Sequence, residues 1–205
     1  DASFDLMSRP VSVGGRLATL FFVDGFTKDE VISKMLQYLT GLTPDKVTGI
    51  TSADEFITRY ITYTEVESTV DFDKAVTAVL SGTTALVMEG LDRIILVDAR
   101  TYPVRGVEEP ETDRVLRGSR DGLVETLVFN AALIRRRLRD PALTMEVIQV
   151  GRISSTDVCL CYMADRVDKT YLKRVRERLS NITIPALTMG QESLAECLLR
   201  GQWYN

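Results

Sequence analysis

Arginines concentrate around one predicted helix in the second half of the chain, and their charge gives them the clearest capacity for chemistry. Within "RGSRDGLVETLVFNAALIRRRLRDP" (residues 117–141), a run near the helix end comprises Arg135, Arg136, Arg137 and Arg139. Guanidinium groups bind carboxylates and phosphates through paired hydrogen bonds. Part of the run has a structural explanation, because a cation at a helix C-terminus gains about 0.3–1 kcal/mol from the carbonyl end. Arg135 and Arg139 share one face of this helix, whereas Arg136 and Arg137 point elsewhere.

Further arginines precede the same helix, where the explanation from the helix end does not apply. Arg114, Arg117 and Arg120 need another partner, and an external anion such as a carboxylate is one candidate. The alternative is an internal network of ion pairs, which we favour because acids are abundant nearby. These acids are Glu108, Glu109, Glu111, Asp113 and Glu125.

Two aspartates are the candidates for acid–base or cation-binding chemistry. Asp24 and Asp98 each follow a predicted strand, at the ends where sheets of this class often hold ligands. Paired carboxylates bind cations or transfer protons. The alternative is an ordinary turn, which "DG" after a strand favours. The chain has no histidine, so His-dependent nucleophiles and His metal ligands are excluded. We therefore expect no enzyme, no metal site and no cofactor.

Composition restricts the class of protein further. Apolar residues make up 45% of the 205 residues and charged residues 26%, as in ordinary globular proteins. The three cysteines, an odd and sparse number, fit a reducing compartment. The net charge of −4 is uneven, since residues 1–98 carry 15 acids and 8 bases and residues 99–205 carry 14 acids and 17 bases. A basic footprint for nucleic acid is missing, so we expect no nucleic-acid partner.

The first half of the sequence predicts a sheet covered by helices. Strands are expected over 4–13 and 17–24, joined at Gly14-Gly15, and a second hairpin over 84–100. Helix starts are expected at capping residues, which are Thr27 with Glu30, Ser52 with Glu55, and Asp71.

The second half begins with a charged segment, 99–121, which we interpret as a linker between the subdomains. A helix is expected from Ser119 or Asp121, with one buried stripe formed by Leu123, Leu127, Ala131, Ile134 and Leu138. A third hairpin follows over 144–163. Asp168 then caps a helix, and a last helix covers 191–199. The predicted fold class is α/β (mixed α+β), with two small subdomains, 1–98 and 122–205, each a mostly hairpin-built mixed sheet flanked by helices.

Three segments resemble the spore germination A-subunit family of the GerA type. They are "LFFVDGFTKDEV" (20–31), "YPVRGVEEPETDRVLRGSRDGLVET" (102–126) and "VFNAALIRRRLRDPALTMEVIQVGRISSTDVCLCYM" (128–163). "RGSRDG" with "VETLVFN" looks closer to the stage V sporulation protein AF branch than to nutrient-receptor A subunits, which more often read "RGPREGF". The ending "WYN" looks like the start of the segment that leads into the family's membrane part.

This resemblance implies the soluble N-terminal domain of a protein of the endospore inner membrane. Such proteins act in germination, when nutrient signals trigger release of ions and of calcium dipicolinate. The implied partners are other germination membrane proteins or copies of the chain itself, and the implied role is assembly or signal relay. The alternative is a small-molecule sensor for a nutrient or dipicolinate, with Arg105, Arg117 or Arg120 holding a carboxylate.

The resemblance also gives the bases of the last part of the chain a role. A domain tethered to a membrane meets anionic lipid, where each basic side chain near the surface contributes about 1 kcal/mol. The candidates for facing the membrane are Lys173, Arg174, Arg176, Arg178 and Arg200.

Overall fold

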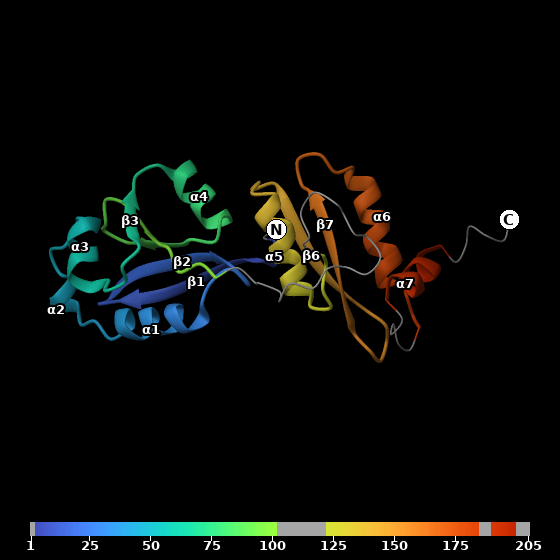
Figure 1. Ribbon diagram of the computed structural model, residues 1–205, viewed down its shortest axis with the longest axis horizontal. Coiled ribbons are helices and arrows are strands. Elements are labelled where there is room, and N and C mark those ends of the chain that lie inside the picture. Colours follow the sequence, from blue (N-terminus) through green and yellow to red (C-terminus); the bar gives the residue numbers. More distant parts are fainter. Residues whose placement is uncertain (1–2, 102–121, 185–189, 200–205) are drawn as a thin grey trace. The chain divides into compact units, whose positions relative to one another are not determined.

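The computed structural model describes residues 3–101, 122–184 and 190–199 (Figure 1). The chain divides into two compact units. One is Asp5–Pro141, and the other combines Asp1–Phe4 with Ala142–Asn205. The predicted fold class is confirmed, since both units carry antiparallel strands with helices packed on them. The predicted division at 99–121 stays a prediction, because most of that segment lies outside the described residues.

The Asp5–Pro141 unit contains a five-stranded sheet in the order β1-β2-β4-β5-β3, with antiparallel neighbours throughout. Its strands are β1 (Leu6–Val13), β2 (Arg16–Val23), β3 (Val66–Thr69), β4 (Thr84–Met88) and β5 (Ile94–Val97). The hairpin turn between β1 and β2 has φ of 55° at Gly14 and 80° at Gly15. Glycine adopts these left-handed values without steric cost, which confirms the predicted turn.

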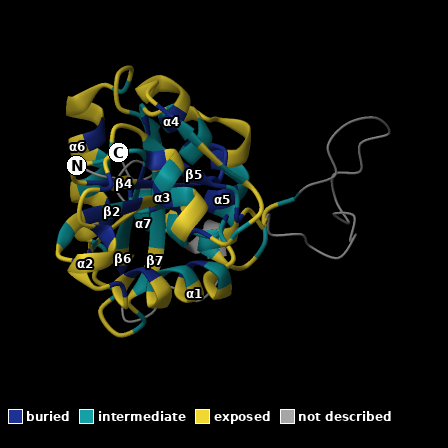
Figure 2. Cartoon of the chain, turned by 90° about the vertical axis from the view of Figure 1, so that its left-hand side faces the viewer, coloured by how far each residue is buried: buried dark blue, intermediate teal, exposed yellow. Residues whose placement is uncertain are grey.

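Helices cover both faces of this sheet, and Figure 1 shows α1 and α4 on opposite sides of it. The helices of the unit are α1 (Asp29–Thr40), α2 (Pro44–Val47), α3 (Ala53–Tyr60), α4 (Phe72–Leu80) and α5 (Leu127–Arg137). The larger core, which contains Leu20, Phe56 and Ile95, lies on the side of α1 and α3. On the other side, α4 packs Ala75 against Ala85 and Leu96. The central strand β4 is buried at every position except Val87, and Figure 2 shows exposed positions on the helices around the strands.

Helix caps in this unit were predicted correctly where the cap is purely local. The Ser52 hydroxyl accepts from the Glu55 N–H at 3.4 Å, and the Asp71 carboxylate accepts from the Lys74 N–H at 3.1 Å. The predicted cap at Thr27 is wrong, because α1 begins after Lys28 without a side-chain cap. Thr27 instead forms a β-bridge with Arg100, and this long-range pairing holds its backbone outside the helix.

The prediction for α5 also needs correction. The helix begins after Thr126 rather than at Ser119 or Asp121, and Leu123 and Leu138 of the expected stripe are 68% and 50% exposed. The Asn130 side chain bonds both the N–H and the carbonyl of Val124, at 2.7 and 2.6 Å. These bonds hold the backbone near Val124 outside the helix. The residues that α5 buries are Ala131, Ala132 and Arg135.

The second unit is built on the predicted third hairpin. Its elements are β6 (Leu143–Val150), β7 (Thr156–Met163), α6 (Lys169–Ser180) and α7 (Gly190–Leu199). Asp168 caps α6 as predicted and accepts from the N–H groups of Thr170 and Tyr171 at 2.7 and 3.1 Å. Phe4, predicted in the first strand, belongs to this unit instead, because its N–H donates to the carbonyl of Met145 at 2.9 Å.

Candidate functional site: basic helix surfaces

Arg135 lies inside the Asp5–Pro141 unit. Its side chain is 0% exposed and faces Asp5, whose side chain is 1% exposed. The guanidinium donates to the two carboxylate oxygens of Asp5 at 2.7 and 3.1 Å, and to the carbonyl of Asp140 at 3.0 Å. A buried guanidinium with this bidentate partner holds the fold together and is out of reach of another molecule. Its candidacy as an interaction residue is therefore corrected to a structural role.

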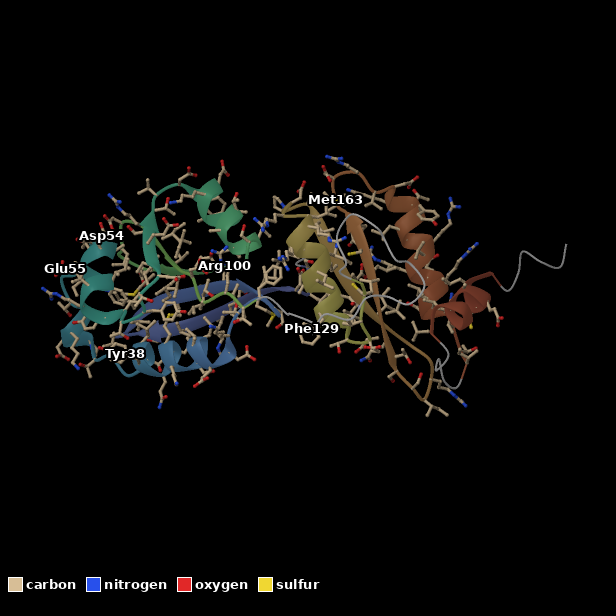
Figure 3. The ribbon with its side chains drawn as sticks, viewed as in Figure 1. Tyr38, Asp54, Glu55, Arg100, Phe129 and Met163 are labelled. Carbon is tan, nitrogen blue, oxygen red and sulfur yellow. The ribbon has the colours of Figure 1, made fainter. Side chains whose placement is uncertain are left out.

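The other arginines at the end of α5 remain on the surface. Arg136, Arg137 and Arg139 are exposed, and the first two lie in the last turn of the helix. The exposed ring of Phe129, labelled in Figure 3, belongs to the same helix and is 44% exposed. A surface that combines guanidinium groups with an aromatic ring has the composition of many protein–protein contacts. The role of these three arginines as interaction residues stays a prediction.

Several candidates fall outside the described residues. These are Arg105, Arg117 and Arg120, proposed for an external anion, and Arg200, proposed for the membrane. Their roles stay predictions, as does the ion-pair network with the acids of that segment.

The second basic surface is the outer face of α6. Leu172 and Leu179 of this helix are buried, which leaves the opposite side to solvent. Tyr171, Arg174 and Arg178 are exposed and follow each other at spacings of three and four residues, so they form one row. Lys173 is exposed on a neighbouring row, with its ammonium 3.9 Å from the Glu177 carboxylate. Arg178 also lies in the last turn, where its charge stabilises the carbonyl end of the helix.

Arg176 of α6 differs from these neighbours because it is directed at the sheet. Its guanidinium contacts the Glu146 carboxylate on β6 at 2.6–3.0 Å and the Tyr162 hydroxyl on β7 at 3.0 Å. The guanidinium carbon lies 5.8 Å from the centre of the Tyr162 ring. The hydrogen bonds to Glu146 raise the pKa of Arg176 above its ordinary value. We therefore remove Arg176 from the residues expected to face a membrane, since its Nε and Nη2 groups donate to Glu146 and Tyr162 within the unit.

The two aspartates at strand ends have different surroundings. Asp24 lies in a turn after β2, in which the next residue, Gly25, has a left-handed φ of 79°. Asp98 accepts from the Nε of Arg100 at 2.6 Å, and the hydrogen bonds from Arg100 lower the pKa of its carboxyl. The turn interpretation therefore applies to Asp24, whereas Asp98 belongs to an ion pair.

The described part of the chain contains no group of three or more potential ligand side chains placed to hold a metal ion. None of its helices has the length and apolar character needed to cross a membrane.

Comparison with known proteins assigns the whole chain to one family. The family model for the Bacillus/Clostridium GerA spore germination protein matches residues 1–205. Stage V sporulation protein AF of Bacillus subtilis (strain 168) is 31% identical over 99% of this chain and 41% of its own length. A relative from the same strain, named uncharacterized membrane protein YfkQ, is 26% identical over 89% of this chain and 36% of its own length. The chain thus spans well under half the length of these relatives.

A solved structure supports the fold. The N-terminal domain of the A subunit of the Bacillus megaterium spore germinant receptor GerK3 matches with a TM-score of 0.67 and 23% identity. The match covers 88% of this chain and 66% of that domain.

Proposed function

Because this chain belongs to the Bacillus/Clostridium GerA spore germination protein family, we propose that it acts by contact, in assembly and signal relay. In this proposal, it is the N-terminal domain of a protein of the spore inner membrane. Its contacts are with the anionic membrane surface and with other germination proteins or copies of itself. The relay leads to release of ions or dipicolinate during germination.

The outer row of α6 is the observation that carries the membrane part of this proposal. Arg174 and Arg178 project on the same side of the helix as Tyr171, whose ring is 64% exposed. Arginine and tyrosine both place an apolar body against lipid while their polar ends stay in water. Each arginine close to an anionic surface contributes about 1 kcal/mol to binding.

A vesicle experiment tests this contact directly. The 205-residue chain is sedimented with vesicles of phosphatidylglycerol and phosphatidylcholine, and separately with phosphatidylcholine alone. We expect binding to the anionic vesicles only, weakening as salt is raised. Reversing both charges with Arg174→Glu and Arg178→Glu removes two attractions and adds two repulsions. At about 1 kcal/mol per charge, this double variant should bind more than tenfold more weakly.

The matched control carries Lys28→Glu and Lys46→Glu, two exposed bases of the other unit. It changes net charge by the same amount and should leave vesicle binding nearly unchanged. Equal losses in both double variants would show that only the overall charge matters. Undiminished binding by the α6 variant would exclude this face as the membrane contact.

A further inference from the structure

The turn that joins β6 to β7 carries an apolar side chain at its tip. The turn covers residues 151–155, and Ile153 is 72% exposed there. Turns are usually made of glycine, asparagine, aspartate, serine and proline, because these residues suit the turn backbone or bond to it. A β-branched apolar residue has no such local reason to occupy a turn, so its position in water indicates a contact outside the chain.

Hydrogen bonds within the turn hold it in one shape. The N–H of Ser155 donates to the carbonyl of Gly151 at 3.2 Å, and the hydroxyl of Thr156 donates to that of Ser154 at 2.9 Å. Ser155 has a left-handed φ of 44°, which residues other than glycine adopt only where their surroundings impose it. The turn therefore presents Ile153 to the outside and does not let it fold back onto the strands.

The turn lies at the end of the second unit where α6 ends. The N–H of Arg152 donates at 3.0 Å to the carbonyl of Ile184, in the segment that follows the helix. Leu179, in the last turn of α6, belongs to the same buried cluster as Val150, the residue just before the β6–β7 turn. Figure 1 shows the β6–β7 turn and the end of α6 on the same side of this unit. The turn therefore continues the outer row of α6 at its C-terminal end.

Two guanidinium groups flank the apolar tip. Arg152 is exposed directly before Ile153, and Arg178 is exposed in the last turn of α6. Guanidinium groups donate paired hydrogen bonds to phosphate oxygens. The tip thus combines one apolar side chain with two groups that bind phosphate.

The acids near this end of the unit do not cancel the positive charge. Asp157 on β7 accepts from the Gln149 amide at 3.3 Å, and its neighbour Val158 packs on the side of α6. Side chains alternate between the faces of a strand, so Asp157 points to the face away from that helix. Glu177 of α6 lies 3.9 Å from the ammonium of Lys173. The two guanidinium groups therefore leave the α6 side of the tip with net positive charge.

This combination of groups fits the surface of an anionic bilayer. Lipid headgroups present phosphate oxygens at the level of the guanidinium groups. An apolar side chain between them reaches the boundary with the acyl chains, where burial of its surface is favourable. A small soluble anion would use the two arginines but would leave Ile153 in water.

We propose that the β6–β7 turn inserts Ile153 into the interface of an anionic bilayer, with Arg152 and Arg178 bound to the phosphates around it. This inference rests on the membrane contact proposed for α6 and adds the residue that enters the lipid. Salt screens the attraction between arginine and phosphate, whereas the gain from apolar burial does not depend on charge. The two contributions therefore respond differently to added salt.

Sedimentation with the anionic vesicles described above measures the effect of the apolar tip. Ile153→Ser should weaken binding about 5- to 20-fold, the range expected for partial burial of an isoleucine side chain. The ratio of wild-type to Ile153→Ser affinity should stay constant as salt is raised, whereas the ratio for Arg178→Gln should fall toward one. Leu17→Ser is the matched control, because Leu17 is 65% exposed in the other unit, and it should leave binding unchanged.

Fluorescence reports whether the tip enters the lipid. The single tryptophan of the chain is removed with Trp203→Phe, and Ile153→Trp is added. On anionic vesicles, emission from the indole at position 153 should move to shorter wavelength and be quenched by phosphatidylcholine brominated on its acyl chains. Leu17→Trp in the same background should show neither change. An unchanged urea midpoint shows that each variant is folded.

Other results would overturn the inference. Unchanged binding by Ile153→Ser, or an unquenched indole at position 153 on bound chains, would exclude insertion. A shift of emission without vesicles that grows with protein concentration would assign the turn to contact between copies of the chain. In these cases, weaker binding by Arg174→Glu with Arg178→Glu would still support the membrane contact of α6. Absence of vesicle binding by the wild-type chain would overturn that contact and this inference together.

Discussion

The buried pair of Asp5 and Arg135 gives the sharpest test of the structure. Asp5→Ala removes two charge-assisted hydrogen bonds from a guanidinium at 0% exposure, which keeps its hydrogen bond to the carbonyl of Asp140 at 3.0 Å. Removing one partner of a buried pair costs about 3–5 kcal/mol, because the other charge is left uncompensated. We therefore expect Asp5→Ala to lower the free energy of unfolding of the Asp5–Pro141 unit by this amount.

A double variant shows how much of the cost of Asp5→Ala comes from leaving the Arg135 charge buried without a partner. Asp5→Leu with Arg135→Met removes both charges and fills the space with apolar groups. Such replacements of buried pairs are often neutral or stabilising. The double variant should therefore lose much less stability than Asp5→Ala, although the two positions are far apart in the sequence.

Urea unfolding followed by circular dichroism measures these differences, with the transition of each unit fitted separately because a chain of two units need not unfold in one step. Asp165→Ala is the matched control, since it breaks an ion pair with Arg166 whose side chains are 53% and 76% exposed. Exposed pairs contribute about 0–1 kcal/mol. A loss below about 1 kcal/mol for Asp5→Ala would refute the reasoning, since it would mean that water reaches Arg135.

Three further outcomes follow from local contacts. Asp71→Ala should lower the stability of the first unit by about 1 kcal/mol, the usual value of a helix N-cap, and an unchanged urea midpoint would contradict the cap. Backbone N–H groups of Tyr171 and Thr170 lower the pKa of Asp168 in the folded chain. The stability that Asp168 contributes is therefore fully present above its unfolded-state pKa, and it is lost as the pH falls through the lower folded-state pKa. Acid unfolding of Asp168→Asn should lack this contribution, and identical pH profiles would contradict it. Glu146→Gln keeps one acceptor for the half-exposed Arg176. In urea unfolding, this change should cost the second unit at most about 1 kcal/mol of stability. A larger loss would mean that the pair is more deeply buried than the structure shows.

Local features of this fold were predictable from the sequence because the residues that determine them are close together. The Gly14-Gly15 turn needs left-handed backbone, which glycine supplies, and the caps at Ser52, Asp71 and Asp168 act on N–H groups two or three residues away. Each of these was predicted at the correct residue, and so was the mixed α+β class that the hairpins and helices imply.

Long-range pairing could not be predicted in the same way. The partner of Arg135 is Asp5, which is 130 residues earlier in the chain, so the position of this arginine in a charged helix end suggested a solvated side chain. Thr27 has the sequence of a capping residue, but its bridge to Arg100 holds it outside the helix.

The central claim, that this domain acts in germination through contacts made by its basic surfaces, is tested most directly in spores. The measurement is the rate of dipicolinate release from spores whose germination protein carries Arg136→Glu and Arg137→Glu, compared with Lys28→Glu and Lys46→Glu. The variant domain should be as stable as the wild type in urea and present at the same level in the spore. Slower release in the arginine variant alone is the result that the proposed contact predicts, whereas normal release in a folded, fully expressed arginine variant would contradict it.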